Sequence, residues 1–212
     1  MNALRTIIKY NNRQIYNGSL RNLSYVQGQE PIPGRREYFY YINHEGMLFL
    51  DDARIKNFTS CFKEKKFLQF FFSRIKVNDT DKYSQEFPFI SPCGRESNYI
   101  RCDDLPIVYT HIIEKDNQLK LTFGYAGDLL TAEFDPQKIF MNPKSGRVYH
   151  PASEKVGKIG LIRSKLAIEL SKSFEFENGD QNPPTHIIWN GKKLLLDFDW
   201  VKGIEIKNEF EE

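Results

Sequence analysis

Residues 36–50 read REYFYYINHEGMLFL, and this stretch decides the class of fold. Aromatic and branched side chains run from Tyr38 to Ile42, which is typical of a β-strand because such side chains fit a pleated, half-buried surface. The turn residues His44-Glu45-Gly46 interrupt the apolar run, and it resumes from Met47 to Leu50. The stretch therefore predicts a β-hairpin.

The residues after the hairpin predict a helix. Asp51-Asp52 and Asn57 supply N-cap chemistry, and apolar side chains at 58, 61, 62, 68, 72 and 75 share one helical face. We expect a helix over 57–75, in one piece or broken near 63–66. Residues 67–72 are apolar nearly all round, so Phe67 or Phe70 must meet a second element, a partner or water. We expect this face to touch either the segment after Ser24 or a partner protein.

The remainder favours strands, with one more helix. Asn190-Gly191 is a strong hairpin signal, because a type I′ turn needs positive φ at both central residues. Gly46 to Phe49 and Gly146 to Tyr149 are each followed by a predicted helix, and we interpret this echo as two copies of a strand–turn–strand–helix unit. The predicted strands are 83–90, 98–102, 107–113, 119–125, 129–134, 147–150, 185–189 and 193–198, and the second helix is 161–170.

Together these patterns predict one α+β domain over 36–205. We expect a curved, mostly antiparallel sheet with two or three helices packed on one side. Residues 24–35 are interpreted as a linker, and 206–212 as an acidic, solvated tail.

The first 23 residues are typical of a mitochondrial transit peptide. No acid precedes Glu30, and Arg5, Lys9 and Arg13 stack on one helical face opposite apolar residues. An arginine at position 21 lies three residues before Ser24, a pattern at which matrix proteases cut. We expect a mitochondrial matrix protein; a loose cationic tail is the alternative.

Charge and composition exclude several classes. The 212 residues include 30 basic and 28 acidic ones, a net charge of +2, so no global basic field attracts nucleic acid. No apolar run is long enough to span a membrane. There is no secretory signal, so Cys61, Cys93 and Cys102 are interpreted as reduced thiols.

Candidate catalytic and metal-binding residues are few. Cys93 follows a proline and precedes Gly94, so it could act as a nucleophile with His111 or His150 as base. Cys93, Cys102, His111 and His150 could ligate zinc, but their gaps of nine, nine and thirty-nine residues match no standard template. We expect neither metal nor cofactor.

A dense charged patch is the better candidate for binding. It comprises Arg95, Glu96, Arg101, Asp103 and Asp104. We interpret it either as a salt-bridged turn that protects strand edges or as the polar rim of a site for a small ligand or a partner. Phosphate-binding glycine loops and nucleophile-elbow strings are absent from the sequence.

Several local strings resemble a eukaryotic family built on a domain of unknown function. They include Arg36 to Tyr41, Phe49 to Asp52, Ser91 to Glu96 and Tyr149 to Ala152, and they cover nearly all of the chain after residue 24. The resemblance implies a mitochondrial association for some relatives and no assigned reaction. A fainter similarity, in residues 38–75 and in the Ser91-Pro92 and Asp103 to Pro106 strings, is to a bacterial β-rich family of unknown function with repeated motifs.

We therefore expect a mitochondrial module that binds a small ligand or a protein partner and performs no catalysis of its own. The alternative is a thiol-dependent enzyme using Cys93 with His111 or His150. The expected partners include no nucleic acid.

Overall fold

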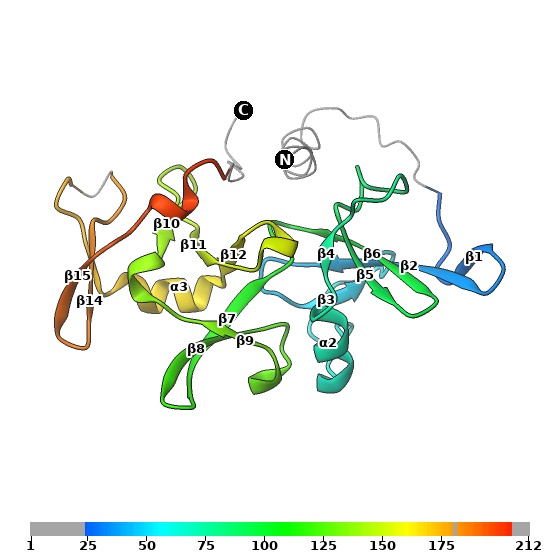
Figure 1. Ribbon diagram of the computed structural model, residues 1–212, viewed down its shortest axis with the longest axis horizontal. Helices are drawn as coiled ribbons and strands as arrows, with labels where there is room; N and C mark the ends of the chain where they lie inside the picture. The colour runs from blue at the N-terminus through cyan, green and yellow to red at the C-terminus, as the bar shows by residue number, and fades with distance from the viewer. Residues whose placement is uncertain (1–23, 180–181, 205–212) are drawn as a thin grey trace.

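The computed structural model of the protein describes residues 24–179 and 182–204 (Figure 1). The predicted leader over 1–23 and the predicted acidic tail over 206–212 lie outside these residues. Strand β1 (Gln29–Ile32) pairs antiparallel with β2 (Arg35–Ile42). The segment that we interpreted as a linker thus contributes a strand to the first sheet.

The predicted hairpin over 38–50 is confirmed as β2 and β3 (Leu48–Leu50). Asn43 closes its turn, because the Asn43 side chain accepts a hydrogen bond of 2.8 Å from the backbone N–H of Met47. Gly46 adopts a φ of 82°, in the left-handed region that glycine enters without strain.

Strand β2 is buried on both faces, which explains its consecutive aromatic side chains. On one face Phe39 packs in a cluster with Phe87 and Tyr99. On the other face Tyr40 and Ile42 belong to the main hydrophobic core.

The centre of the first sheet is a parallel pair. Strand β6 (Glu96–Cys102) runs parallel to β2 from Arg36↔Glu96 to Ile42↔Cys102. The first sheet has the order β1-β2-β6-β5-β4, with β3 also paired to β2, β4 at Lys76–Val77 and β5 at Phe89–Cys93. The strand predicted over 83–90 begins only at Phe89, because Tyr83 has a φ of 54° and lies in a turn.

Two further sheets follow in the chain. The second has the order β10-β11-β12-β7-β8-β9, in which only the β12–β7 pair is parallel. Its strands are β7 (Val108–Lys115), β8 (Gln118–Phe123), β9 (Thr131–Glu133), β10 (Phe140–Met141), β11 (Val148–Pro151) and β12 (Ile159–Ile162). The third sheet comprises β13 (Phe174–Glu175), β14 (His186–Trp189) and β15 (Lys192–Leu195).

The predicted Asn190-Gly191 hairpin is confirmed. The two residues join β14 to β15 with φ values of 50° and 73°. Short 3-10 turns connect other elements, at Gly127–Leu129, Pro136–Lys138, Glu154–Val156 and Asp199–Val201.

Helix α2 (Lys65–Phe72) is shorter than the helix predicted over 57–75. Asn57 starts a turn instead, because its Oδ1 atom accepts a hydrogen bond of 2.9 Å from the N–H of Thr59. Residues 53–64 therefore form an exposed loop, which we call the 53–64 loop.

The carboxylate of Glu64 caps α2. It accepts hydrogen bonds from the backbone N–H groups of Lys66, at 3.0 Å, and of Phe67. These bonds hold the pKa of the Glu64 carboxyl below its usual value. In the structure the helix thus begins after Glu64, within the region 63–66 where we predicted that it could be broken.

Helix α3 (Ser164–Ser171) starts after the residue predicted, because Leu161 and Ile162 belong to β12. All four residues of β12 are buried, so the apolar run there reflects a strand covered on both faces rather than a helix face.

The architecture is α+β, with mostly antiparallel sheets and two α-helices among the described residues. The prediction of a single sheet is wrong, because three sheets form. The ladder of the first sheet ends where the N–H of Asp103 donates to the carbonyl of Ile42, and the turn through Pro106 carries the chain into the second sheet. The main core is shared between these sheets: Tyr40, Phe71, Tyr109 and Leu121 all belong to it.

Candidate functional site

The turn between the first two sheets holds two acidic residues that face different partners. Asp103 accepts hydrogen bonds from the His44 backbone N–H and from its ring Nδ1, both at 3.0 Å, and from the Tyr41 hydroxyl. Although burial raises the pKa of the Asp103 carboxyl, the bonds from Tyr41 and His44 outweigh it and leave the pKa below its usual value. The carboxylate thus fixes His44 on the β2–β3 turn.

The second acid, Asp104, is buried. Its Oδ2 atom accepts hydrogen bonds from Arg147 Nη1 at 2.5 Å and from the Tyr149 hydroxyl at 2.9 Å. Both donors lie at the start of β11, so Asp104 holds Arg147 in place across from His44.

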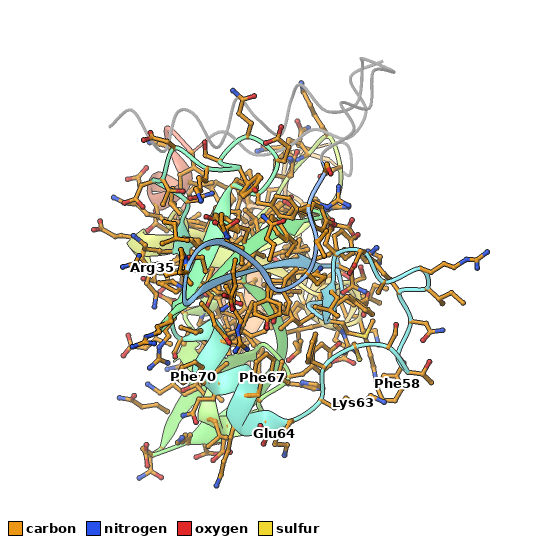
Figure 2. The ribbon with its side chains drawn as sticks, turned by 90° about the vertical axis from the view of Figure 1, so that its right-hand side faces the viewer. Arg35, Phe58, Lys63, Glu64, Phe67 and Phe70 are labelled. Atoms are coloured by element: carbon orange, nitrogen blue, oxygen red, sulfur yellow. The ribbon has the colours of Figure 1, made fainter. Side chains whose placement is uncertain are left out.

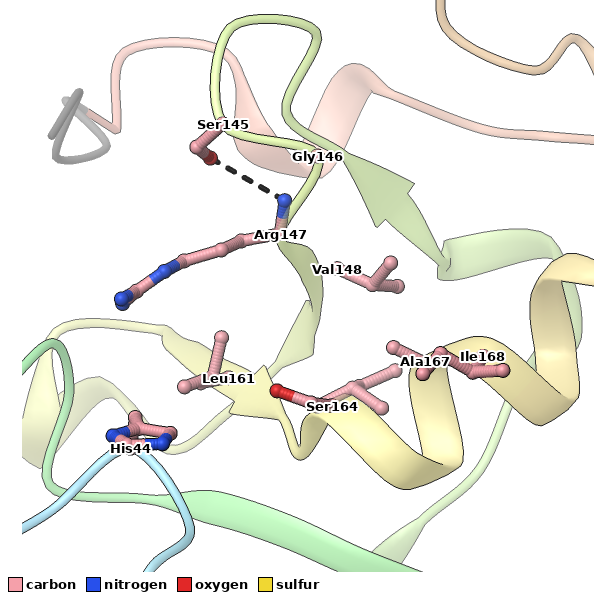
Figure 3. A pocket seen from close by; sticks show the side chains of 10 residues that line it. His44, Ser145, Gly146, Arg147, Val148, Leu161, Ser164, Ala167 and Ile168 are labelled. Carbon is pink, nitrogen blue, oxygen red and sulfur yellow. Dashed lines mark hydrogen bonds between the residues drawn. The ribbon is translucent and has the colours of Figure 1, made fainter. Parts of the chain in front are cut away.

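A pocket of about 230 Å³ lies between these two anchored side chains (Figure 3). His44, Arg147 and Ser164 reach it from three separate segments: the β2–β3 turn, the start of β11 and the start of α3. Its apolar lining consists of Val148, Leu161, Ile162, Ala167 and Ile168. The arrangement suits a ligand with one polar end and one apolar end.

Arg163 ties the walls of this pocket together. Its Nε atom lies 3.3 Å from Glu45 Oε2, an ion pair without the alignment of a hydrogen bond, and its Nη1 donates to the Tyr125 hydroxyl at 3.2 Å. The Tyr125 hydroxyl in turn donates to the carbonyl of Glu45 at 3.0 Å. The start of α3 is thereby held against the turn that carries His44.

The structure does not gather the predicted charged patch into one place. Arg101 pairs with Asp51, whereas Arg95 and Glu96 lie at the opposite end of β6. A strand of that length separates its ends by about 20 Å. The carbonyl of Arg95 accepts a hydrogen bond of 3.1 Å from the N–H of Arg36. Of the five predicted residues, only Asp103 and Asp104 support the pocket.

The thiol and the imidazoles of the predicted enzyme lie on different sheets: Cys93 on the first sheet, and both His111 and His150 on the second. The Cys93 sulfur contacts the Ser91 hydroxyl at 3.6 Å and makes no hydrogen bond with His111 or His150. His111 is exposed on β7, where its Nδ1 lies 3.1 Å from the hydroxyl of Thr110. Burial, Arg163 and Lys165 lower the pKa of His111.

His150 is buried, and both of its ring nitrogens lie within hydrogen-bond distance of backbone groups. Its Nε2 atom accepts from the backbone N–H of Asp135 at 3.2 Å, and Nδ1 lies 3.2 Å from the carbonyl of Pro151. Burial lowers the pKa of the imidazole. Within the described residues, no three His, Cys, Asp or Glu side chains, Cys102 included, cluster so that they could hold a metal ion.

The two candidate phenylalanines of α2, Phe67 and Phe70, differ in how far other residues cover them. Phe67 packs against Phe62, with 5.1 Å between ring centroids, so the preceding loop covers it rather than the segment after Ser24. That segment packs elsewhere: the ring of Tyr25 stacks on Phe39 at 4.0 Å. Phe70 is 44% exposed.

His44, Arg147 and Ser164 are not among the site residues predicted from the sequence. A signal was available, since the two glycine strings that resemble each other, Gly46 to Phe49 and Gly146 to Tyr149, begin at the turns that form opposite walls of the pocket. The strings were interpreted as evidence for a repeat, and not for a shared cavity.

The fold and the pocket define an α+β protein with a small, polar-rimmed pocket. Residues 27–201 match the family described as a domain of unknown function, DUF4505, and the chain belongs to that family. The family resemblance predicted from the sequence is confirmed.

Two solved structures of bacterial DUF1285 family proteins are weakly similar. For the protein from Shewanella baltica OS155, the TM-score is 0.41 and the identity 14%, over 65% of this chain and 94% of that one. For the protein from Silicibacter pomeroyi DSS-3, the TM-score is 0.43 and the identity 18%, over 84% of this chain and 92% of that one. The fainter bacterial similarity seen in the sequence is thus found again.

Proposed function

We propose that the protein is a non-catalytic binding module of the mitochondrial matrix and that the pocket between His44, Arg147 and Ser164 is its ligand site. The observation that carries the proposal is the convergence of three polar side chains, from segments far apart in the chain, over an apolar floor. Binding sites are commonly built in this way, from a few placed polar groups on an apolar lining.

The chemistry of the lining favours a small monocarboxylic acid with a short apolar chain. Arg147 and His44 each already contact a carboxylate, so the pocket rim is polar without a large excess of positive charge. The Ser164 hydroxyl and the His44 ring can contact one carboxylate group, and Leu161 and Ile168 can cover the chain. A volume of about 230 Å³ favours a ligand smaller than a nucleotide.

The mitochondrial part of the proposal is supported by the basic, acid-free composition of residues 1–29. The alternative function, a thiol enzyme using Cys93, is not favoured by any contact, because neither His111 nor His150 meets the thiol. No helix among the described residues is long and apolar enough to cross a membrane.

We also propose that the pocket lies where two copies of one structural unit meet. The turns of the β2–β3 and β10–β11 hairpins both start at an asparagine, Asn43 or Asn142, and contain a glycine of positive φ, Gly46 or Gly146. Each hairpin precedes a helix, a two-residue strand and a second hairpin: α2-β4-β5-β6 in the first half and α3-β13-β14-β15 in the second. In the second half, β12 is inserted before the helix.

Ligand-observed NMR with a panel of short-chain carboxylic acids tests the site. Ile168 is 63% exposed at the rim, so Ile168→Trp should fill the pocket without disturbing the core, and we expect it to abolish binding. Ser164→Ala should weaken binding, whereas Ser171→Ala at the far end of α3 should not. The matched control for the large side chain is Ile188→Trp on β14. Equal binding by Ile168→Trp and Ile188→Trp would exclude this pocket as the site.

A further inference from the structure

The 53–64 loop and the outer side of α2 form a surface that is both apolar and strongly basic. Ile55 and Phe58 are 65% and 68% exposed on the loop, and Phe70 is exposed on the helix beside it. Figure 2 shows Phe58 and Lys63 at the outer edge of the molecule, next to the helix that carries Phe67 and Phe70. We call this surface the basic aromatic face.

The charge of this face stands out from that of the whole chain. Residues 53–74 contain six basic side chains and one acid, Glu64, a net charge of +5 in a chain whose total is +2. The Glu64 carboxylate is engaged at the N-terminus of α2. The six basic residues are Arg54, Lys56, Lys63, Lys65, Lys66 and Arg74, all of them exposed.

None of these six cations forms an ion pair with a carboxylate in the part of the chain that the structure describes. Two of them instead lie over exposed aromatic rings. The Lys63 ammonium is 3.9 Å from the centroid of the Phe58 ring, and the Arg74 guanidinium is 3.7 Å from that of Phe70. In these two pairs, an exposed apolar side chain thus lies beside a cation that no carboxylate in the described residues neutralises.

We propose that the basic aromatic face docks the protein on an anionic lipid surface, with Phe58 and Ile55 entering the headgroup region. Amphipathic elements at membrane interfaces combine the same two features: apolar side chains that insert and lysines or arginines that attract anionic lipids. The Lys63–Phe58 stack keeps an ammonium at the depth of the headgroups while the ring enters beneath it.

A lipid surface fits this face better than a folded partner does. Phe58 stands on a projecting loop rather than in a groove, and four of the six cations are lysines, which act as separate point charges. Protein recognition would instead use a central, well-packed pocket with aromatic or arginine anchors. The pocket between His44 and Ser164 involves none of these residues, so the lipid-binding role is independent of the ligand site.

Vesicle flotation of the full chain tests the charge. We expect binding to phosphatidylcholine vesicles that contain about 30% phosphatidylglycerol and little binding to phosphatidylcholine alone. Lys63→Glu with Lys66→Glu should reduce binding at least about tenfold. The matched control is Lys172→Glu with Lys192→Glu, two exposed lysines outside the face, and it should bind more strongly than the face variant.

A tryptophan placed on the loop tests insertion and separates this face from the basic leader predicted over 1–23. In Phe58→Trp, brominated lipid in anionic vesicles should quench the added fluorescence, whereas in Leu195→Trp, at a residue 62% exposed elsewhere, it should not. The native Trp189 and Trp200 contribute equally to both variants. Equal quenching in the two variants, or equal binding by the two lysine double variants, would overturn the proposal. A protein partner would then be the better explanation of the basic aromatic face.

Discussion

The Tyr149 hydroxyl donates a hydrogen bond of 2.9 Å to the buried carboxylate of Asp104, and Arg147 reaches the same oxygen atom. These contacts join the turn after the first sheet to the strand that forms one wall of the pocket. Asp104→Asn keeps the shape but removes the charge, so it should lower the free energy of unfolding by about 3 kcal/mol. Urea unfolding measures this change. The control Asp128→Asn, at an exposed ion pair, should cost less than about 0.5 kcal/mol; similar losses in both variants would contradict the role of Asp104.

Gly160 on β12 is predicted to be intolerant of even a methyl group. A Cβ atom there would lie 2.6 Å from the ring of Tyr109, which is itself buried. Gly160→Ala should therefore destabilise the protein by about 2 kcal/mol through overpacking. Gly94→Ala adds the same methyl group to open space, at a φ of 65°, and should cost about 1 kcal/mol from backbone strain alone. Thermal and urea unfolding of the pair would reveal whether packing at Gly160 has the larger effect.

The buried His150 predicts a pH dependence of stability. Its folded-state pKa lies below the unfolded value of 6.5, so the unfolded chain binds the proton more readily. The stability contributed by the neutral ring is complete above pH 6.5 and is lost as the pH falls from there toward the lowered folded-state pKa. His150→Gln should flatten the dependence between about pH 7.5 and about pH 5.5. Urea unfolding across this pH range measures the change, and an equally steep curve for His150→Gln and for the unaltered protein would contradict the assignment.

Cys93 is expected to be dispensable for chemistry. Among the described residues, the Ser91 hydroxyl is the one hydrogen-bond partner of the Cys93 sulfur, and a hydroxyl at position 93 can keep that contact. Cys93→Ser should thus cost about 1 kcal/mol of stability and leave ligand binding intact. Rapid labelling of Cys93 by iodoacetamide that His111→Ala or His150→Ala abolishes would instead support the thiol-enzyme alternative.

The leader prediction is tested by mass spectrometry of the endogenous protein. We expect the mature chain to begin at Ser24, because residues 1–23 have the charge pattern of a segment removed on import. A fusion of residues 1–35 to a reporter should reach mitochondria. An intact Met1 on most of the protein pool, or a fusion that stays in the cytosol, would refute the matrix assignment.

Local turn chemistry made the hairpins predictable. Asn43 to Gly46 and Asn190-Gly191 determine their turns through side-chain bonds and positive φ, and these act within a few residues. The helix predicted over 57–75 is too long because the Asn57 side chain is hydrogen-bonded within a local turn. The periodicity of apolar residues does not reveal such a bond. The run at Leu161 and Ile162 was ambiguous for a related reason: full burial removes the alternation that marks a strand.

The site was harder to predict than the fold. His44 and Arg147 are about a hundred residues apart in sequence, and they line one pocket only because the second sheet packs against the β2–β3 turn. The charged patch was selected for its density along the chain. In the structure these side chains face different partners. Arg101 pairs with Asp51, whereas Asp103 binds His44 and Asp104 binds Arg147.

The parallel pairing of β2 with β6 has a consequence for how the chain folds. Arg36 meets Glu96, sixty residues later, so the centre of the first sheet closes only after α2, β4 and β5 exist. Contacts so distant in sequence slow folding, because the entropy of closing the loop is lost before the contact stabilises anything. As the chain emerges from the ribosome, the aromatic strand from Tyr38 to Ile42 keeps one edge unpaired until β6 has been synthesised. A molecular chaperone that shields this strand would protect it during that interval, and a chain truncated before Glu96 would leave the edge unpaired permanently.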